Sequence, residues 1–210
     1  MATTPVRRVA ADEILLPDGA TPTGTSGRIL EAALGLFAQW GFHGTSIRAI
    51  GAEVGINSAS LYAHYDSKEE ILRDLIMIGI SELDRRVRSA VAAADGTVDQ
   101  LRAVVHEHVL AHASYPLLAV VTNSEQHALS AQFAEPAVRI RAELQQLVTE
   151  ILGRGVREGV FDTPDPVLAG RAIAGMGQHV AHWFRSRHPE EREDVANRYV
   201  EFALRIAGAA

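Results

Sequence analysis

Residues 44–72 read GTSIRAIGAEVGINSASLYAHYDSKEEIL, and the fold predicted for the chain follows from this stretch. Ile47, Ile50 and Val54 recur at helical spacing, and a second apolar run follows after a short polar interval. Gly55 suits the turn between the two runs, because glycine reaches positive φ without a steric penalty. The spacing predicts a helix-turn-helix followed by a third helix, a geometry that places one helix in the major groove of DNA.

Polar side chains stand where these helices are expected to begin. Thr45 and Asn57 can each accept a hydrogen bond from an otherwise unpaired backbone N–H, so they are the predicted caps of the two short helices. Ser67 and Glu70 stand three apart and predict a capping box before the next helix. Lys68, the only lysine of the chain, opposes the helix dipole in that first turn. A phosphate is favoured at a helix N-terminus, so we expect Lys68 to bind DNA phosphate.

The segment resembles the TetR family of bacterial transcriptional regulators. The residues that carry the resemblance are Arg28, Ile29, Ala33, Phe37, Gly41, Thr45, Ile50, Ala52, Gly55, Leu61, Tyr62, His64 and Lys68. They cover the first third of the chain with high specificity, and the remaining predicted helices agree with the family in length and number. The resemblance implies a homodimeric repressor with an N-terminal helix-turn-helix that binds double-stranded operator DNA and a C-terminal domain that binds a small molecule.

The resemblance also implies roles for single residues of the helix-turn-helix. Positions that contact phosphates in the family are matched by Thr45, Tyr62, His64 and Lys68. Positions that face base edges are matched by Ser46, Arg48, Ser58, Ala59 and Ser60. Small side chains let the backbone approach the bases closely, and arginine commonly bonds guanine through two N–H groups. Two alternatives stay open, because Tyr62 can pack within the helix pair and Arg48 can be a solvated surface residue.

Composition is that of a soluble, cytoplasmic protein. The 210 residues include no cysteine, which excludes disulfides and thiolate metal sites. No run approaches the roughly 18 apolar residues of a membrane span, and no apolar core of a signal peptide is seen at the N-terminus. The net charge of −6 argues mildly against nucleic-acid binding. The charges between Arg28 and Tyr65 cancel, so we expect only modest non-specific affinity for DNA.

Helical periodicity almost without a strand signal predicts an all-α fold with two domains. We expect a three-helix DNA-binding domain over 26–72 and a ligand-binding and dimerisation domain over 73–210. Residues 1–25 are rich in Thr, Pro, Gly and Ala, and they predict a disordered arm. Arg7 and Arg8 can carry this arm into a minor groove, although a tail without DNA contacts is the commoner outcome.

Apolar stripes and turn residues predict the remaining helices. They are expected at about 69–94, 97–115, 117–129, 136–159, 166–187 and 189–207. Proline is favoured in the first turn of a helix, so Pro136 is predicted to open one of them. The run Thr163-Pro164-Asp165-Pro166 is predicted to cap another.

The last two helices are the predicted dimer interface, because the resembling family forms its dimers there. Small residues that let a second helix approach closely form one narrow stripe, which consists of Gly170, Ala174, Gly177 and Ala181. Tyr199 and Phe202 of the last helix complete the predicted dimer contacts.

Histidines in the second domain are the main indication of a ligand. His108 and His112 lie on an otherwise apolar helix face, and buried polar groups need partners. Imidazoles among apolar side chains suit an amphipathic ligand with a carbonyl, carboxylate or thioester. The predicted ligand-binding residues are His108, His112, Asn123, His127, Met176, His179 and Trp183. The simpler interpretation of the apolar members is that they pack the core.

The effector and the class of regulator stay open in the sequence. The segments Gly175-Met176-Gly177 and Trp183-Phe184-Arg185 loosely resemble FadR-like family members that sense acyl-CoA or lipid-derived molecules, so an acyl-CoA is a candidate. His108 and His112 can instead be metal ligands, with a third ligand from His127, His179 or Glu125. No His-Glu-x-x-His motif, phosphate-binding loop or nucleophile elbow occurs, so no catalytic residue, metal or cofactor is assigned. The alternatives are a metal-responsive regulator and an architectural DNA-binding protein without an effector.

Overall fold

The computed structural model describes residues 13–185 and 188–209, and within them the chain is helical without a β-strand. The predicted all-α fold is confirmed. The chain divides into two compact units. The first holds the described residues up to Glu82, together with Tyr115–Val138 and Ala181–Trp183. The second holds Leu83–Ser114, Arg139–Val180 and the described residues from Phe184 onward.

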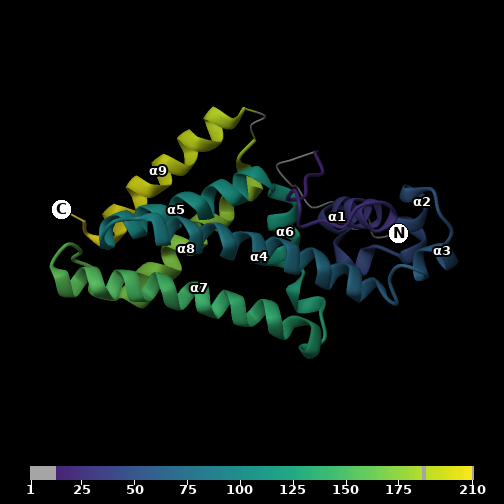
Figure 1. Ribbon diagram of the computed structural model, residues 1–210, viewed down its shortest axis with the longest axis horizontal. Coiled ribbons are helices and arrows are strands. Elements are labelled where there is room, and N and C mark those ends of the chain that lie inside the picture. Colours follow the sequence, from purple (N-terminus) through teal and green to yellow (C-terminus); the bar gives the residue numbers. More distant parts are fainter. Residues whose placement is uncertain (1–12, 186–187, 210) are drawn as a thin grey trace, which may run out of the picture. The chain divides into compact units, whose positions relative to one another are not determined.

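Four helices begin the chain, labelled α1 (Thr25–Gly44), α2 (Ile47–Val54), α3 (Ser58–Tyr62) and α4 (Lys68–Ala93) (Figure 1). The predicted helix-turn-helix is α2 and α3. Gly55 ends α2 in the left-handed region with φ 79°. Asn57 caps α3 as predicted, because its side chain accepts a hydrogen bond from the N–H of Ser60 at 2.8 Å. Local sequence signals therefore located the turn and its second cap correctly.

The predicted cap of α2 was wrong by one residue. Ser46 caps this helix, and its hydroxyl accepts from the N–H of Ala49 at 3.1 Å. Thr45 is buried instead, and its hydroxyl donates to the carbonyl oxygen of Gly41 at 2.9 Å. The physical reason is a break in α1 at Gly41, where φ is 74° and ψ is 167°. The carbonyl at such a break needs a new donor, and Thr45 supplies one.

The capping box before α4 forms with one change. Ser67 accepts from the N–H of Glu70 at 3.1 Å, as predicted. The carboxylate of Glu70 reaches back to the N–H of Asp66 at 2.9 Å rather than to Ser67. Apolar side chains of α1, α2, α3 and the first half of α4 form the core of the first unit, and its fully buried members include Ile29, Leu30, Leu34, Phe37, Ile50, Leu61, Ile71, Leu72, Leu75 and Ile76.

The predicted disordered arm is described only in part, because residues 1–12 lie outside the described residues. Residues 13–24 make turns that pack on α1. Pro17 is buried, and the hydroxyl of Thr21 donates to its carbonyl oxygen at 3.2 Å. The end of the Ile14 side chain lies directly over Gly35. These apolar residues give the segment a packing surface that the composition of the arm as a whole did not suggest.

The other described helices are α5 (Thr97–Ser114), α6 (Pro116–Ser124), η1 (Gln126–Ala128), α7 (Ala131–Glu158), α8 (Pro166–Trp183) and α9 (Pro189–Ala207). Helix α7 begins at Ala131, so the prediction that Pro136 opens it was wrong. The carbonyl oxygen of Ser130 accepts from the N–H groups of Phe133 and Ala134, which starts the helix a turn and a half earlier. Asp165 caps α8 through the N–H of Leu168 at 3.0 Å, as predicted.

The core of the second unit lies among α5, α7, α8 and α9. Helices α5 and α9 run beside each other, and buried members of the cluster include Leu101, Val105, Val109, Ile151, Leu152, Ile173, Val195, Ala196 and Val200. None of the described helices combines the length and hydropathy that crossing a bilayer requires.

The small residues of α8 pack against helices of the same chain. A Cβ at Gly170 would lie 3.0 Å from Nε2 of Gln145 on α7. A Cβ at Gly177 would lie 3.5 Å from Val109 on α5. Ala181 is also buried, and Ala174 is partly buried. Gly170 thus faces α7 and Gly177 faces α5 within the chain, and the dimer contacts expected from this stripe stay a prediction.

Candidate nucleic-acid interface and effector site

The residues predicted to face base edges lie on the exposed side of α2 and α3. Ser46, Arg48, Ala59 and Ser60 are exposed, and Ser58 is partly buried at the start of α3. The short side chains of Ser58, Ala59 and Ser60 leave the N-terminal backbone of α3 accessible, which the close approach of a recognition helix to DNA requires. Their base contacts stay a prediction.

Two of the four predicted phosphate-binding residues have side chains exposed to solvent. The side chain of Tyr62 is 51% exposed, so it is not buried in the helix pair. His64 is exposed, and its Nδ1 lies 3.1 Å from the hydroxyl oxygen of Ser26. Both residues can donate a hydrogen bond to a phosphate oxygen from the end of α3.

Lys68 and Thr45 already have partners inside the protein. The Lys68 ammonium donates to the carbonyl oxygens of Phe42 and Thr45, each at 2.6 Å, and lies 4.1 Å from the centroid of the Phe42 ring. Burial lowers the pKa of Lys68. An ammonium has three N–H groups, so one remains for phosphate beside the two bound carbonyls. Lys68 therefore has a structural task that the sequence did not indicate.

His108 and His112 lie together on α5, with ring centroids 4.5 Å apart. Nδ1 of His112 lies 2.7 Å from the carbonyl oxygen of His108. A carbonyl only accepts, so this nitrogen carries the proton. Burial, followed by the neighbouring His112 and Arg141, holds the pKa of His108 well below its usual value. His108 is therefore neutral near pH 7.

One polar atom of this pair has no partner. His108 as a residue is only partly buried, but its Nε2 is sealed from solvent and has no hydrogen bond within the described part of the chain. Its ring lies 3.6 Å from where a Cβ on Gly177 of α8 would be. Buried polar atoms without partners are uncommon in native proteins, so the atom marks this place as a candidate ligand contact.

The other predicted ligand-binding residues are distributed over both units. Met176 packs against the apolar core that contains α5, whereas His179 is exposed. Asn123, His127 and Trp183 belong to the first unit, in which Trp183 is 49% exposed. The structure thus brings His108 and His112 together and places Gly177, which follows Met176 on α8, beside His108.

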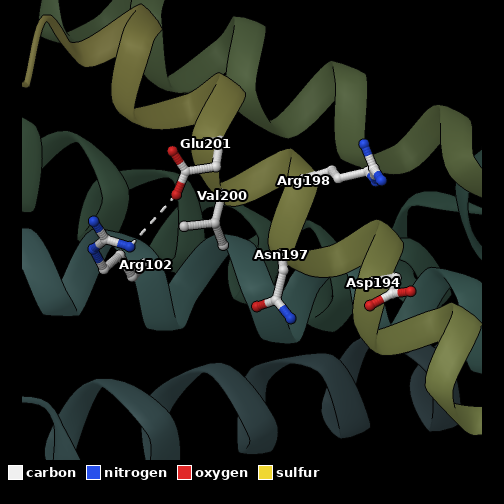
Figure 2. A pocket seen from close by; sticks show the side chains of 6 residues that line it. All are labelled: Arg102, Asp194, Asn197, Arg198, Val200 and Glu201. Carbon is white, nitrogen blue, oxygen red and sulfur yellow. Dashed lines mark ion pairs between the residues drawn. The ribbon is translucent and has the colours of Figure 1, made fainter.

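A surface hollow of about 310 Å³ lies between α5 and α9, and Figure 2 shows its lining. Its residues are Arg102, Asp194, Asn197, Arg198, Val200 and Glu201. The Arg102 guanidinium is 3.7 Å from the Glu201 carboxylate. Charges of both signs with a single apolar member do not match an apolar effector. No group of three or more His, Asp or Glu side chains able to hold a metal ion occurs among the residues that the structure describes.

Comparison with known proteins gives a family match for the N-terminal helices and another for the C-terminal helices. Residues 29–75 match the family model of the bacterial regulatory proteins of the tetR family, and residues 94–207 match that of the tetracyclin repressor-like C-terminal domain. The chain belongs to the TetR family. It is a helix-turn-helix transcriptional regulator.

Several TetR-family proteins are similar to this regulator over most of its length. The HTH-type transcriptional repressor KstR2 of Rhodococcus jostii is 28% identical and aligns over 90% of this chain and 95% of its own. A TetR-family regulatory protein of Rhodococcus RHA1 has a crystal structure with 30% identity and a TM-score of 0.82, covering 90% of this chain and 100% of its own. The ketosteroid transcriptional regulator KstR2 of Mycobacterium tuberculosis has 25% identity and a TM-score of 0.82, with coverages of 91% and 100%.

The sequence did not indicate the contact that Glu125 makes in this TetR-family regulator. Its carboxylate accepts a hydrogen bond from the N–H of Phe42 at 3.0 Å, across 83 residues of chain. The sequence had placed Glu125 only among the candidates for a third metal ligand beside His108 and His112. Side-chain bonds to distant backbone groups have no sequence periodicity, so pattern reasoning does not find them.

His106 gives this regulator a pH-dependent link between α5 and α9. Its Nδ1 lies 3.4 Å from Glu107 and its Nε2 lies 2.8 Å from Glu193. The hydrogen bond to Glu107 is the largest cause that raises the pKa of His106, and Glu193 adds to it against desolvation. The protonated form therefore stabilises the fold fully below the unfolded pKa of about 6.5, and this stabilisation is lost as the pH rises through the higher folded value.

Replacing His106 with glutamine is expected to lower the free energy of unfolding more at about pH 5.5 than at about pH 8.5. The difference should be only about 0.5 kcal/mol, because Glu193 is half exposed and solvent screens the pair. Urea unfolding of both proteins at the two pH values measures it. An equal loss at both pH values would mean that the His106 charge does not contribute.

Proposed function

We propose that this TetR-family regulator is a cytoplasmic homodimeric repressor that binds palindromic operator DNA and is released by a small amphipathic effector, for which an acyl-CoA is the candidate. The similarity to KstR2, whose name states that it is a transcriptional repressor, supports repression. In a dimer, two copies of α3 enter successive major grooves about 34 to 36 Å apart. An effector that changes this spacing then lowers operator affinity, and operator in turn lowers effector affinity.

The observation that carries the effector proposal is the unpartnered Nε2 of His108. A buried polar atom without a hydrogen bond costs about 1 to 3 kcal/mol. A carbonyl, carboxylate or thioester oxygen that reaches this nitrogen relieves the cost, while the surrounding apolar side chains of α5 and α8 hold the rest of the molecule. The neutral state of His108 suits such a ligand, because Nε2 can donate without bringing a charge into the core.

Exposed apolar residues on α8 and α9 support the dimer. Leu168 is 63% exposed and Val167 is 45% exposed on α8. On α9, Phe202 is 47% exposed and Ile206 is 37% exposed, and the Phe202 ring contacts Tyr199 at a centroid distance of 5.8 Å. Large apolar side chains that stay exposed on the surface are typical of regions that contact another protein. Tyr199 and Phe202 are therefore the residues of the proposed interface that we expect to contribute most.

Replacing His108 with leucine is expected to separate effector binding from DNA binding. Operator affinity should stay within about threefold of wild type, because α5 lies outside the helix-turn-helix. Thermal stability should be unchanged or higher, since an unpartnered polar atom is replaced by an apolar side chain. The concentration of acyl-CoA or fatty acid that releases half of the operator DNA should rise by about tenfold or more. Anisotropy of labelled operator DNA during compound titration measures the release.

The exposed His182, replaced with leucine, is the matched control and should leave the release curve unchanged. A His108 variant that unfolds at lower temperature and still responds normally would show that this histidine only packs the core.

A further inference from the structure

Glu125, which follows α6, is a carboxylate buried in the first unit. Its side chain is 2% exposed, and Oε2 accepts the hydrogen bond from the backbone N–H of Phe42. Phe42 comes directly after the break of α1 at Gly41. An N–H group at such a break loses regular helical geometry, and a buried one needs another acceptor. Glu125 supplies that acceptor from a distant part of the chain.

The opposite side of the same residue is held by α4. The Lys68 ammonium donates to the carbonyl oxygen of Phe42 and to that of Thr45, each at 2.6 Å. Thr45 in turn closes the break by donating to the carbonyl oxygen of Gly41 at 2.9 Å. The peptide groups of 41–45 are thereby fixed by an acid from the end of α6 and by a base from the start of α4. We call this arrangement the Phe42 clamp.

The Phe42 clamp sits immediately before the DNA-reading helices. Ser46 follows segment 41–45 and caps α2, whose inner residue Ile50 is fully buried in the same unit. Helix α3 is joined to α2 by the tight turn at Gly55. A shift of the Phe42 backbone therefore moves the start of α2, and with it the α2–α3 pair. Recognition depends on where that pair lies, because its residues must meet base edges within hydrogen-bonding distance.

We propose that Glu125 is a positioning residue for DNA reading. It acts through the backbone of Phe42, and its bond fixes the direction in which the chain leaves α1 and enters the helix-turn-helix. Two further contacts hold the neighbouring chain to α4: the N–H of Ser130 donates to Glu69 at 2.6 Å, and the Arg73 guanidinium lies 5.0 Å from the Phe133 ring centroid. The acceptor at Glu125 is thus attached to the same helix that carries Lys68.

The inference rests on the DNA binding of the family's N-terminal domain and does not depend on the proposed effector. Its test uses the full-length protein and a duplex that the wild-type protein selects from a random pool. Glu125→Gln keeps an oxygen that accepts the Phe42 N–H, so operator affinity should stay within about threefold of wild type. Glu125→Ala removes the acceptor, so operator affinity should fall by about tenfold or more.

Amide hydrogen exchange at Phe42, measured by NMR without DNA, reports the clamp directly. Exchange should be about tenfold faster in Glu125→Ala and close to wild type in Glu125→Gln. Normal exchange at Phe42 together with normal DNA affinity in Glu125→Gln would show that the accepted hydrogen bond, and not the charge of Glu125, is what DNA binding requires. Glu125→Asp provides a second variant in case Glu125→Ala does not fold. It keeps the charge, but its side chain is one methylene shorter, so the carboxylate lies farther from the N–H of Phe42.

Faster Phe42 exchange together with weaker operator binding in Glu125→Ala or Glu125→Asp supports the proposal. Unchanged operator affinity in a folded variant with faster Phe42 exchange overturns it. Unchanged Phe42 exchange in both variants overturns it as well, because the bond then does not hold this peptide. An effector panel without any active compound would contradict the proposed release and would leave these two results standing.

Discussion

Replacing Lys68 with methionine is expected to lower the free energy of unfolding by about 2 to 3 kcal/mol, even in the absence of DNA. Methionine keeps an unbranched apolar chain of the length of the lysine stem but removes the charged donors to the carbonyl oxygens of Phe42 and Thr45. Hydrogen bonds from charged groups contribute about 1.5 to 3 kcal/mol each, and partial exposure of Lys68 reduces the sum. Denaturant unfolding monitored by circular dichroism measures the loss.

The same variant is expected to bind every DNA sequence more weakly, because the segment that leads into α2 loses its anchor on α4. Lys68→Arg retains the charge but not the compact ammonium that reaches two carbonyls. Its free energy of unfolding should therefore lie between that of the wild type and that of Lys68→Met. A Lys68→Met protein with wild-type stability, and with a salt dependence of DNA binding flatter by about one counterion, would instead make Lys68 a phosphate contact alone.

Replacing Phe202 with glutamate is expected to give a monomer and to lower operator affinity by about a hundredfold or more. The side chain is 47% exposed on α9 beside Tyr199, where a charge in an apolar dimer contact loses its solvation. A monomer engages one half-site, and linked binding of two half-sites typically raises affinity by about 10² to 10⁴. Sedimentation equilibrium against the chain mass of 22.7 kDa, together with anisotropy on operator DNA, measures both effects.

Val156→Glu is the matched control, because Val156 is 38% exposed on α7 of the same unit. It should remain a dimer with normal operator affinity. A Phe202→Glu protein that sediments as the wild type does would remove α9 from the proposed interface.

Local signals accounted for the helix-turn-helix and for the start of α8. The turn at Gly55, the cap at Asn57 and the start of α8 at Asp165 all depend on residues within a few positions of each other, and all were predicted correctly. Predictions from local sequence were wrong where a contact outside the local pattern used the same side chain. Thr45 suits a helix cap by its chemistry, but the break at Gly41 uses its hydroxyl and leaves the cap to Ser46.

Contacts between residues far apart in the sequence could not be predicted. The small residues of α8 predicted the close approach of another helix, but spacing alone does not say which helix lies against them. In the structure Gly170 faces α7 and Gly177 faces α5. Pairing of Glu125 with Phe42 likewise has no periodic signature. The histidine pair was located in sequence because His108 and His112 stand one helical turn apart, although only the structure identifies the unpartnered nitrogen.

Release of operator DNA by a small molecule is the central claim. The most direct measurement is fluorescence anisotropy on a labelled fragment of the DNA that flanks this protein's own coding region, repeated with a panel of acyl-CoA thioesters and fatty acids. We expect saturable binding that one compound class reverses at saturation, which requires that the compound favour the non-binding state by about 5.5 kcal/mol. Salt-sensitive binding without sequence preference that no compound changes would contradict the account and indicate an architectural DNA-binding protein.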